Sequence, residues 1–215
     1  MKINHKDSTL NVYELGFTCP EALTEILGFL RMFEGQSETV IVHNCAMMPE
    51  LCRKLDVPYF CRHTEIGPII FEYRKEKNPC SMCSKMRRGA LNDLILERGF
   101  NKVALGHHFD DAVETFLMNL LYEGRIGCFE PVTYLSRTGV TQIRPMLYIG
   151  EQAVAGFARR MELPVVENVC PADKHTKRQE VKELIASLQQ QYPDVKTKIF
   201  NSMQRLPLPQ WEPNR

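Results

Sequence analysis

The sequence predicts an α/β fold, a mostly parallel sheet with helices on both faces. Short β-branched runs alternate with runs whose apolar residues recur every three or four positions. The run Thr39-Val-Ile-Val-His is nearly all apolar, as in strands that are buried on both faces. No internal repeat or low-complexity linker interrupts the 215 residues. We therefore expect a polar segment over 1–10, a single domain over 11–205 and a proline-rich, extended tail over 206–215.

The first segments are assigned from apolar spacing and from the residues that end each run. A proline near its first turn and Gly35 after its last apolar residue bound the first helix. The β-branched run that follows is a strand, and Pro58 precedes another apolar run. In order, we predict a strand over 11–17, a helix over 20–33, a strand over 39–43, a short helix over 49–55 and a strand over 59–62.

The alternation continues through the rest of the chain. Gly99 ends a long helix with an apolar stripe, and a short apolar strand follows it. We predict helices over 81–98, 110–122, 151–161 and 176–190, strands over 102–105 and 142–144, and a loop or hairpin over 131–139. Ligands of such sheets bind at the carboxyl ends of the strands, where we expect Cys45, His107 and Arg144.

Composition restricts the compartment and the partners. Basic and acidic residues nearly balance, 27 against 26, so binding to nucleic acid would require a local basic patch. The first residues are polar and resemble no signal peptide, and no apolar run reaches the roughly 18 residues of a membrane span. Eight cysteines in such a chain are expected to be thiols or metal ligands. We predict a cytoplasmic protein without a membrane partner.

Cys80 and Cys83 form a Cys-x-x-Cys pair at the start of a predicted helix, which lowers thiol pKa and presents two thiolates to a metal. Cys170, which precedes a proline, is a candidate third ligand. Three cysteines favour an iron–sulfur cluster with one open iron, while His175 could instead complete a zinc site. An inert pair of thiols is a further alternative. The other cysteines are interpreted as buried thiols: Cys19, Cys45, Cys52, Cys61 and Cys128.

His107, His108, Asp110 and Asp111 occupy a predicted strand-to-helix turn. Capping the helix needs only one of the two carboxylates. The second carboxylate and the two imidazoles indicate a catalytic edge, with an aspartate that binds magnesium.

Glu114 and Thr115 lie one helical turn further on, and Arg144 ends a predicted strand. We interpret all three as candidates for cofactor binding, with Arg144 as a phosphate contact. A plain surface arginine is the alternative for Arg144.

Basic residues gather around the cysteine pair. We call Arg74, Lys75, Lys77, Lys85, Arg87 and Arg88 the basic strip. Lys85, Arg87 and Arg88 are candidates for binding an RNA backbone, and a solvated helix face is the alternative. Lys177 and Arg178 would extend the strip if Cys170 folds back toward Cys80.

Four ordered motifs resemble those of the tRNA 2-thiocytidine biosynthesis family, relatives of tRNA lysidine synthetases in the PP-loop ATP pyrophosphatase superfamily. They are residues 78–91, 105–115, 143–146 and 168–173, and the resemblance extends over about residues 50–205. It implies a Rossmann-like fold of the adenine nucleotide alpha hydrolase type and a 4Fe-4S cluster on Cys80, Cys83 and Cys170. It also implies sulfur transfer to a cytidine of tRNA after adenylation by ATP with Mg²⁺. The partners expected are tRNA, a sulfur donor such as a cysteine desulfurase and, for a dimeric form, a second copy of the chain.

The sequence departs from the family at the nucleotide loop. The family has Ser-Gly-Gly-x-Asp-Ser there, whose backbone N–H groups cradle the pyrophosphate. Here the corresponding turn, residues 16–23, has one glycine, a proline without an N–H group, and Glu21. Two hypotheses follow: an enzyme that adenylates and thiolates tRNA, and a paralogue without ATPase activity that carries sulfur, a cluster or zinc.

Overall fold

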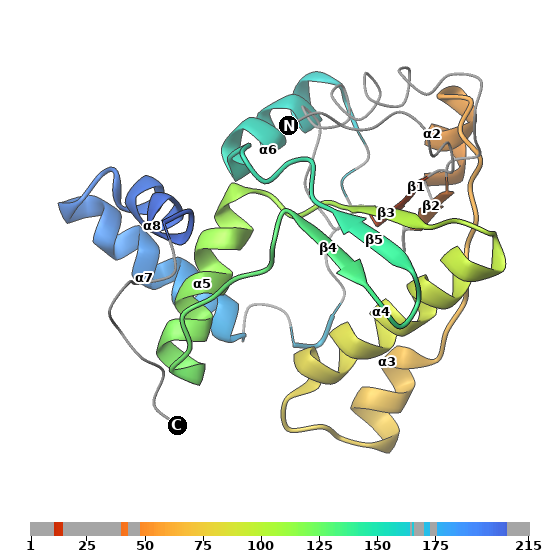
Figure 1. Ribbon diagram of the computed structural model, residues 1–215, viewed down its shortest axis with the longest axis horizontal. Helices are drawn as coiled ribbons and strands as arrows, with labels where there is room; N and C mark the ends of the chain where they lie inside the picture. The colour runs from red at the N-terminus through yellow and green to blue at the C-terminus, as the bar shows by residue number, and fades with distance from the viewer. Residues whose placement is uncertain are drawn as a thin grey trace. The chain divides into compact units, whose positions relative to one another are not determined.

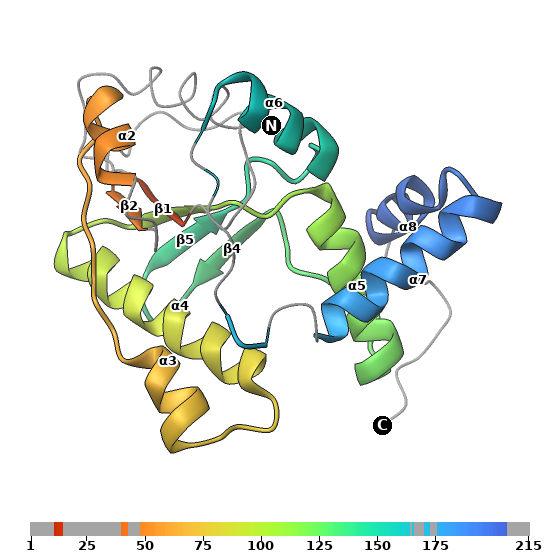
Figure 2. The same cartoon turned by 180° about the vertical axis from the view of Figure 1, so that it is seen from behind.

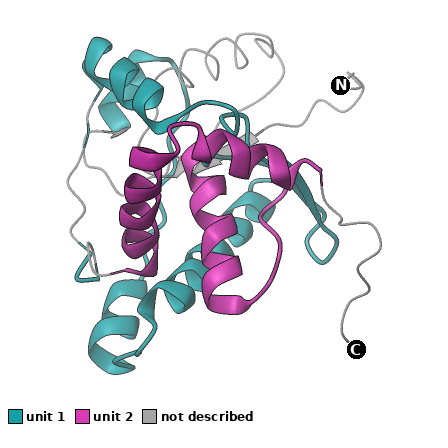
Figure 3. Ribbon diagram, turned by 90° about the vertical axis from the view of Figure 1, so that its left-hand side faces the viewer, with its two compact units in different colours: residues 1–108, 131–173 teal, residues 109–130, 174–215 magenta. Residues whose placement is uncertain are grey.

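The computed structural model describes residues 11–14, 40–42, 48–163, 165, 170–172 and 176–205, with the backbone alone for 11–14, 40–42 and 48. The predicted helix over 20–33, the nucleotide-loop turn over 16–23, Cys19, Cys45 and His175 lie outside these residues. The end segments 1–10 and 206–215 also lie outside them, so the predicted domain bounds stay a prediction. The chain divides into two compact units (Figure 3). We call residues 1–108 with 131–173 the sheet unit, and residues 109–130 with 174–215 the helical unit.

The sheet has five strands in the order β2-β1-β3-β5-β4 (Figure 1). They are β1 (Asn11–Glu14), β2 (Val40–Val42), β3 (Lys102–Leu105), β4 (Val132–Leu135) and β5 (Val140–Ile143). Neighbours pair in parallel except β4, which forms an antiparallel hairpin with β5. The predicted α/β fold with a mostly parallel sheet is thus confirmed, and the loop or hairpin expected over 131–139 is a hairpin.

Helix α4 (Pro79–Glu97) covers one face of this sheet, as Figure 2 shows. Its buried residues Leu91, Leu94 and Ile95 form one apolar cluster with Val103 and Leu105 of β3 and Val140 of β5. The helix ends as the sequence predicts: Gly99 has a positive φ of 74°, and the Phe100 N–H group donates to the Ile95 carbonyl oxygen over 3.0 Å. The apolar stripe of α4 therefore fixes the helix that carries the cysteine pair.

The strand predicted over 59–62 is wrong. Tyr59 forms an isolated bridge, and the residues after it have no regular structure. Side chains hold this segment to the end of α4 instead: the Arg98 guanidinium lies 3.8 Å from the centre of the Phe60 ring, and Arg62 pairs with Glu97. An apolar run that packs through its side chains needs no partner strand, and its sequence pattern does not distinguish the two cases.

Within the described residues, the sheet unit has four further helical segments besides α4. The predicted helices over 49–55 and 151–161 are α2 (Met48–Lys54) and α6 (Glu151–Arg160). Sequence patterns did not predict α3 (Ile66–Pro68) and the π-helix η1 (Ile69–Tyr73), which follow one another directly. In η1 only Ile70 is buried, so there was no apolar periodicity to detect.

The helical unit contains α5 (Phe109–Glu123), α7 (Lys177–Gln191) and α8 (Val195–Met203). Leu117, Val181 and Ile185 are buried, and the rings of Phe109 and Phe200 lie 4.7 Å apart. The Thr176 hydroxyl caps α7 by accepting a hydrogen bond from the Gln179 N–H group. Helices α5 and α7 were predicted, and α8 was not. Among the described residues, none of the helices combines the length and the apolar character needed to span a membrane.

Candidate functional site

The cysteine pair lies in the first turns of α4, where Cys80 is exposed and Cys83 is half-buried. The lowered pKa predicted from the helix start is wrong for Cys80: burial raises the pKa of its thiol, and the charges of Cys170 and Cys83 raise it further. The charge of Cys170 thus acts on Cys80 although the two residues lie far apart in the sequence. A metal centre shared by the three thiols stays a prediction.

The three thiols suit a cluster better than a single ion. Among the described residues, no three His, Cys, Asp or Glu side chains gather closely enough to hold one metal ion. A tetrahedral zinc ion with bonds of about 2.3 Å would draw its sulfur ligands to within about 4 Å of one another. An iron–sulfur cluster binds each cysteine through a different iron and so accepts wider spacing. A cluster with one open iron on Cys80, Cys83 and Cys170 stays a prediction.

The strand-to-helix turn after β3 divides between the two units. His107 and His108 belong to the sheet unit, where His108 is buried, while Asp110 and Asp111 open α5 in the helical unit. The ammonium of Lys196 on α8 donates to Asp110 Oδ1 over 2.7 Å. Catalytic and magnesium-binding roles for these four residues stay predictions.

Glu114 is buried in the helical unit and contacts two basic side chains. Arg178 Nη1 donates to its Oε2 over 2.7 Å, and Lys182 Nζ lies 3.6 Å from its Oε1. Burial raises the pKa of the Glu114 carboxyl, and the contacts with Arg178 and Lys182 only partly offset this effect. Arg178 also donates to Thr115 Oγ1 over 3.2 Å and lies 3.6 Å from Asp111. Residues predicted to bind a cofactor and a residue predicted to bind RNA therefore bind each other.

Lys177 is engaged in a similar way on the surface of the helical unit. Its ammonium donates to both carboxylate oxygens of Glu180 over 3.0 Å and lies 5.0 Å from the centre of the Tyr122 ring. The Tyr122 hydroxyl donates to the same carboxylate over 2.8 Å. The predicted RNA-binding roles of Lys177 and Arg178 stay untested, but both side chains serve contacts within α5 and α7.

Arg144 follows β5 at the carboxyl edge of the sheet, as predicted. Its backbone N–H group donates to the Pro131 carbonyl oxygen over 3.0 Å, and its Nη1 donates to Thr133 Oγ1 on β4 over 3.1 Å. Gln142, which is paired with Thr133 across the hairpin, is buried. The guanidinium is thus fixed to the hairpin, where its predicted role as a phosphate contact stays open to test.

The basic strip lies on α4 and on the loop before it. Arg74 donates to Glu76 Oε1 over 2.6 Å. Lys85, Arg87 and Arg88 are exposed. Within the described part of the chain, Lys75, Lys77, Lys85 and Arg88 form no ion pair. These cations therefore remain available to an anionic partner beside the cysteine pair.

The sequence pattern of the PP-loop domain family matches residues 37–188, most of the chain. The chain belongs to the PP-loop family. It is 33% identical over 162 residues to the tRNA-cytidine(32) 2-sulfurtransferase of Ralstonia nicotianae. This alignment covers 74% of this chain and 52% of that protein. It is 37% identical over 154 residues to the protein of the same name from Anaeromyxobacter dehalogenans, which covers 70% and 53%. This PP-loop chain thus spans about half the length of the curated relatives it matches.

A solved structure has the same fold as this PP-loop protein. It is the U34-tRNA thiolase NcsA from Methanococcus maripaludis with its [4Fe-4S] cluster. The superposition has a TM-score of 0.70 at 21% identity and covers 91% of this chain and 71% of that one. The comparisons confirm the resemblance inferred from the four sequence motifs, and the family explains why strands and helices alternate.

Sequence reasoning missed two basic residues of the PP-loop protein's helical unit, Lys182 and Lys196. The signal was present in part. Arg178 and Lys182 are four residues apart on α7, and Asp111 and Glu114, the carboxylates that they contact, are three residues apart on α5. Complementary charge stripes of this kind indicate two helices that face each other. Lys196 gave no comparable signal, because α8 itself was not predicted.

Proposed function

We propose that this PP-loop protein takes part in the thiolation of a cytidine in tRNA and that Cys80, Cys83 and Cys170 hold a 4Fe-4S cluster. The observation that carries the proposal is the Cys80–Cys83 pair in the first turns of α4, beside the exposed cations Lys85 and Arg88 of the same helix. Cys170 is the third ligand expected from the sequence. The names of the curated relatives support tRNA cytidine as the substrate. A sulfur donor such as a cysteine desulfurase and a second copy of the chain are the further partners we expect.

Each part of the site has a distinct task in this proposal. When bound, the cluster would supply an open iron for the sulfur in transfer. The start of α4 orients Cys80 and Cys83, and the cations of the basic strip neutralise phosphates of the tRNA. Adenylation by ATP would turn the oxygen on carbon 2 of the cytosine into a leaving group, which departs as part of AMP when sulfur attacks that carbon. Arg144 would contact the nucleotide phosphates, and Asp110 and Asp111 would hold Mg²⁺.

Roles are also proposed for His107 and His108 of the sheet unit and for Glu114 and Thr115 of the helical unit. The imidazoles can move protons near neutral pH, which suits them to the adenylation and sulfur-transfer steps. Glu114 and Thr115 orient Arg178 through the contacts described above, so their effect on a nucleotide would be exerted through that side chain.

A second candidate function is a carrier of sulfur or of a cluster without ATPase activity. The sequence favours it at one place, residues 16–23, where a single glycine stands in place of the family's glycine pair. Such a carrier would keep the three thiols and the basic strip and would deliver sulfur to an intact enzyme. Titration calorimetry with ATP and Mg²⁺ separates the two candidates. Failure to bind at millimolar ATP, a binding free energy weaker than about −4 kcal/mol, favours the carrier.

Anaerobic reconstitution with iron and sulfide tests the cluster. We expect a brown protein with about four irons per chain, and loss of the colour in Cys170→Ala. Cys61→Ala is the matched control. The prediction that Cys61 is buried is wrong: it is a free, exposed thiol whose sulfur lies 3.8 Å from His63 Nε2. Binding of one equivalent of zinc with no uptake of iron would contradict the cluster and favour a zinc site. Nucleoside analysis of tRNA incubated with the loaded protein, ATP and a persulfide donor then tests for 2-thiocytidine.

A further inference from the structure

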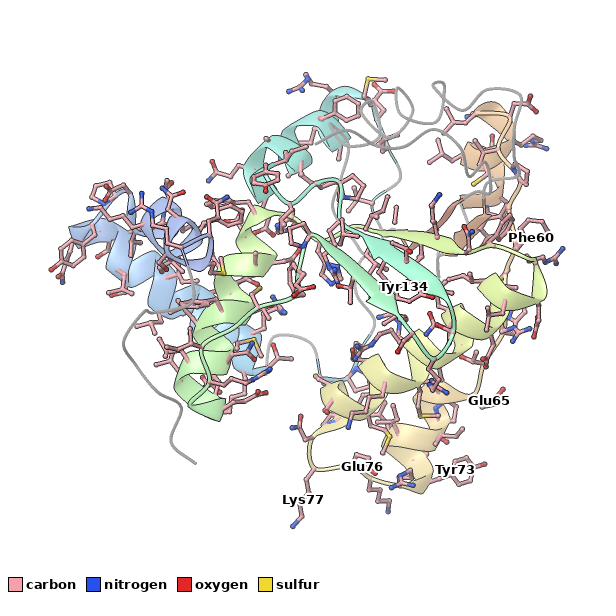
Figure 4. All side chains as sticks on the ribbon, viewed as in Figure 1. Phe60, Glu65, Tyr73, Glu76, Lys77 and Tyr134 are labelled. Carbon is pink, nitrogen blue, oxygen red and sulfur yellow. The ribbon has the colours of Figure 1, made fainter. Side chains whose placement is uncertain are left out.

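Tyr73 is the most exposed large apolar side chain among the described residues, with 80% of its surface open to solvent. It is the last residue of η1, a π-helix, an element that is rare and often found at functional sites. Figure 4 shows Tyr73 and Lys77 at the same end of the sheet unit, by the loop that leads into α4. The ring is thus displayed where the chain approaches the cysteine pair.

The turn that carries Tyr73 is anchored on both sides. Ile70 is fully buried, and its carbonyl oxygen accepts a hydrogen bond from the Glu76 N–H group over 3.2 Å. The Arg74 N–H group donates to the Ile69 carbonyl oxygen over 2.9 Å. Lys75 adopts a left-handed φ of 48°, which costs energy for a residue other than glycine. The fold therefore maintains a strained turn that presents an aromatic ring to solvent.

The surroundings of the ring are cationic. Residues 72–88 contain six basic and two acidic side chains. Glu76 is engaged by Arg74, and within the described residues Lys75, Lys77, Lys85 and Arg88 form no ion pair. Helix α4 contacts η1, so the elements that carry the ring and these cations are neighbours in the sheet unit. An exposed aromatic ring among free cations matches the chemistry of an unpaired nucleotide, whose base stacks while its phosphates meet the cations.

We propose that Tyr73 is a stacking platform for an unpaired nucleotide of the tRNA. The proposal rests on the proposed function and names a contact of the same substrate. Stacking on the flat face of a base carries little sequence preference, so Tyr73 contributes to affinity and to the positioning of the loop near Cys80 and Cys83. Recognition of the base that is modified remains with other residues.

A protein partner fits this surface less well. The centres of protein interfaces are depleted of charged residues, whereas exposed Glu72, Arg74 and Lys75 flank Tyr73. A single ring among charges provides no apolar area for a second fold to cover. It is sufficient for one nucleobase.

The test is equilibrium binding of unmodified tRNA to the full chain over a series of salt concentrations. Tyr73→Ala is expected to weaken binding about five- to tenfold, near the lower end of the effect of losing one stacked base. The slope of log Kd against log salt is expected to stay unchanged, because no charge is lost. Tyr73→Phe and Tyr73→Trp should keep the affinity of the wild type.

Two controls separate stacking from general effects. Tyr134→Ala removes another exposed tyrosine of the sheet unit, 66% exposed on β4, and should bind tRNA like the wild type. A single-stranded oligoribonucleotide should show the Tyr73 effect, and a blunt RNA duplex should not. Thermal unfolding of Tyr73→Ala should match the wild type, since the ring buries little surface.

Two different failures can be told apart. If the wild-type chain binds tRNA and Tyr73→Ala binds equally well, or if Tyr73→Phe is as weak as Tyr73→Ala, stacking is overturned and the proposed function stands. If the wild-type chain binds no RNA at any salt concentration, the proposed function fails and the stacking proposal fails with it.

Discussion

The basic residues of the two units behave in opposite ways. In the sheet unit, most cations of the basic strip have no ion pair within the described residues. In the helical unit, Arg178, Lys182 and Lys196 are bound to carboxylates of α5 at distances of 2.7 to 3.6 Å. From the sequence, Arg178 was predicted to extend the basic strip, whereas Lys182 and Lys196 were not singled out. The difference teaches that a basic side chain indicates an anionic ligand only if it forms no ion pair with a carboxylate of the same fold.

The physical reason is the cost of a buried charge. Glu114 is only 3% exposed, and an ionised carboxylate at such a place needs cations from the same fold. A cation on an exposed helix face such as that of α4 costs almost nothing without a partner. We therefore expect the cations of α7 and α8 to contribute to stability. We expect those of α4 to contribute to the binding of an anionic partner.

The largest expected effect is on stability, from Arg178→Ala. It removes the hydrogen bonds to Glu114 and Thr115 and leaves a buried carboxylate with only Lys182, which lies 3.6 Å away. We expect a loss of about 2 to 4 kcal/mol in the free energy of unfolding, measured by denaturant titration. Lys177→Ala, one residue earlier, is the matched control. Equal stability of the two variants would mean that the contacts of Arg178 with buried Glu114 contribute no more than the exposed contacts of Lys177.

The next effect is on tRNA binding, from Lys85→Ala combined with Arg88→Ala. Loss of two phosphate contacts should weaken binding and reduce the steepness of the salt dependence by about one for each cation. The free energy of unfolding should change by less than about 0.5 kcal/mol, because both side chains are exposed. An unchanged salt slope in a stable variant would show that these two cations contact no phosphates of the tRNA and are only solvated.

Glu114→Gln should change the pH dependence of stability. Burial raises the folded-state pKa of Glu114 above its ordinary value of 4.5, so the native state binds a proton that the unfolded state releases. The wild type should therefore lose this contribution as pH rises from about 4.5 through the raised pKa. The glutamine variant should lose less over the same window, measured by denaturant titration at several pH values. Parallel curves for the two proteins would show that the ion pairs fully offset the effect of burial on the pKa of Glu114.

The smallest effect is expected from Tyr122→Phe on the helical unit. It removes the hydroxyl that donates to Glu180 but keeps the ring beneath the Lys177 ammonium. All these groups are exposed, so the change in stability should be under about 0.5 kcal/mol. A larger loss by thermal unfolding would mean that exposed contacts also contribute to the helical unit.

Much of the candidate site could be predicted from local patterns. The helix that bears Cys80 and Cys83, the strand before His107 and the position of Arg144 at the edge of the sheet all follow from apolar spacing and from the residues that end each run. These patterns lie within a few neighbouring residues, so the elements can be predicted without knowledge of the fold. The segment after Pro58 and the π-helix before Tyr73 were misread or missed, because each is held by a few buried or charged side chains.

The amino-acid order by itself determined the alternation of strands and helices, the family, and the presence of thiols and cations in the chain. The tertiary structure alone decided which of these groups meet. It paired Arg178 with Glu114 and left Lys85 exposed to solvent. Such choices depend on burial and on distances between residues far apart in the chain. Burial sets the cost of every charge, and only the folded chain defines what is buried.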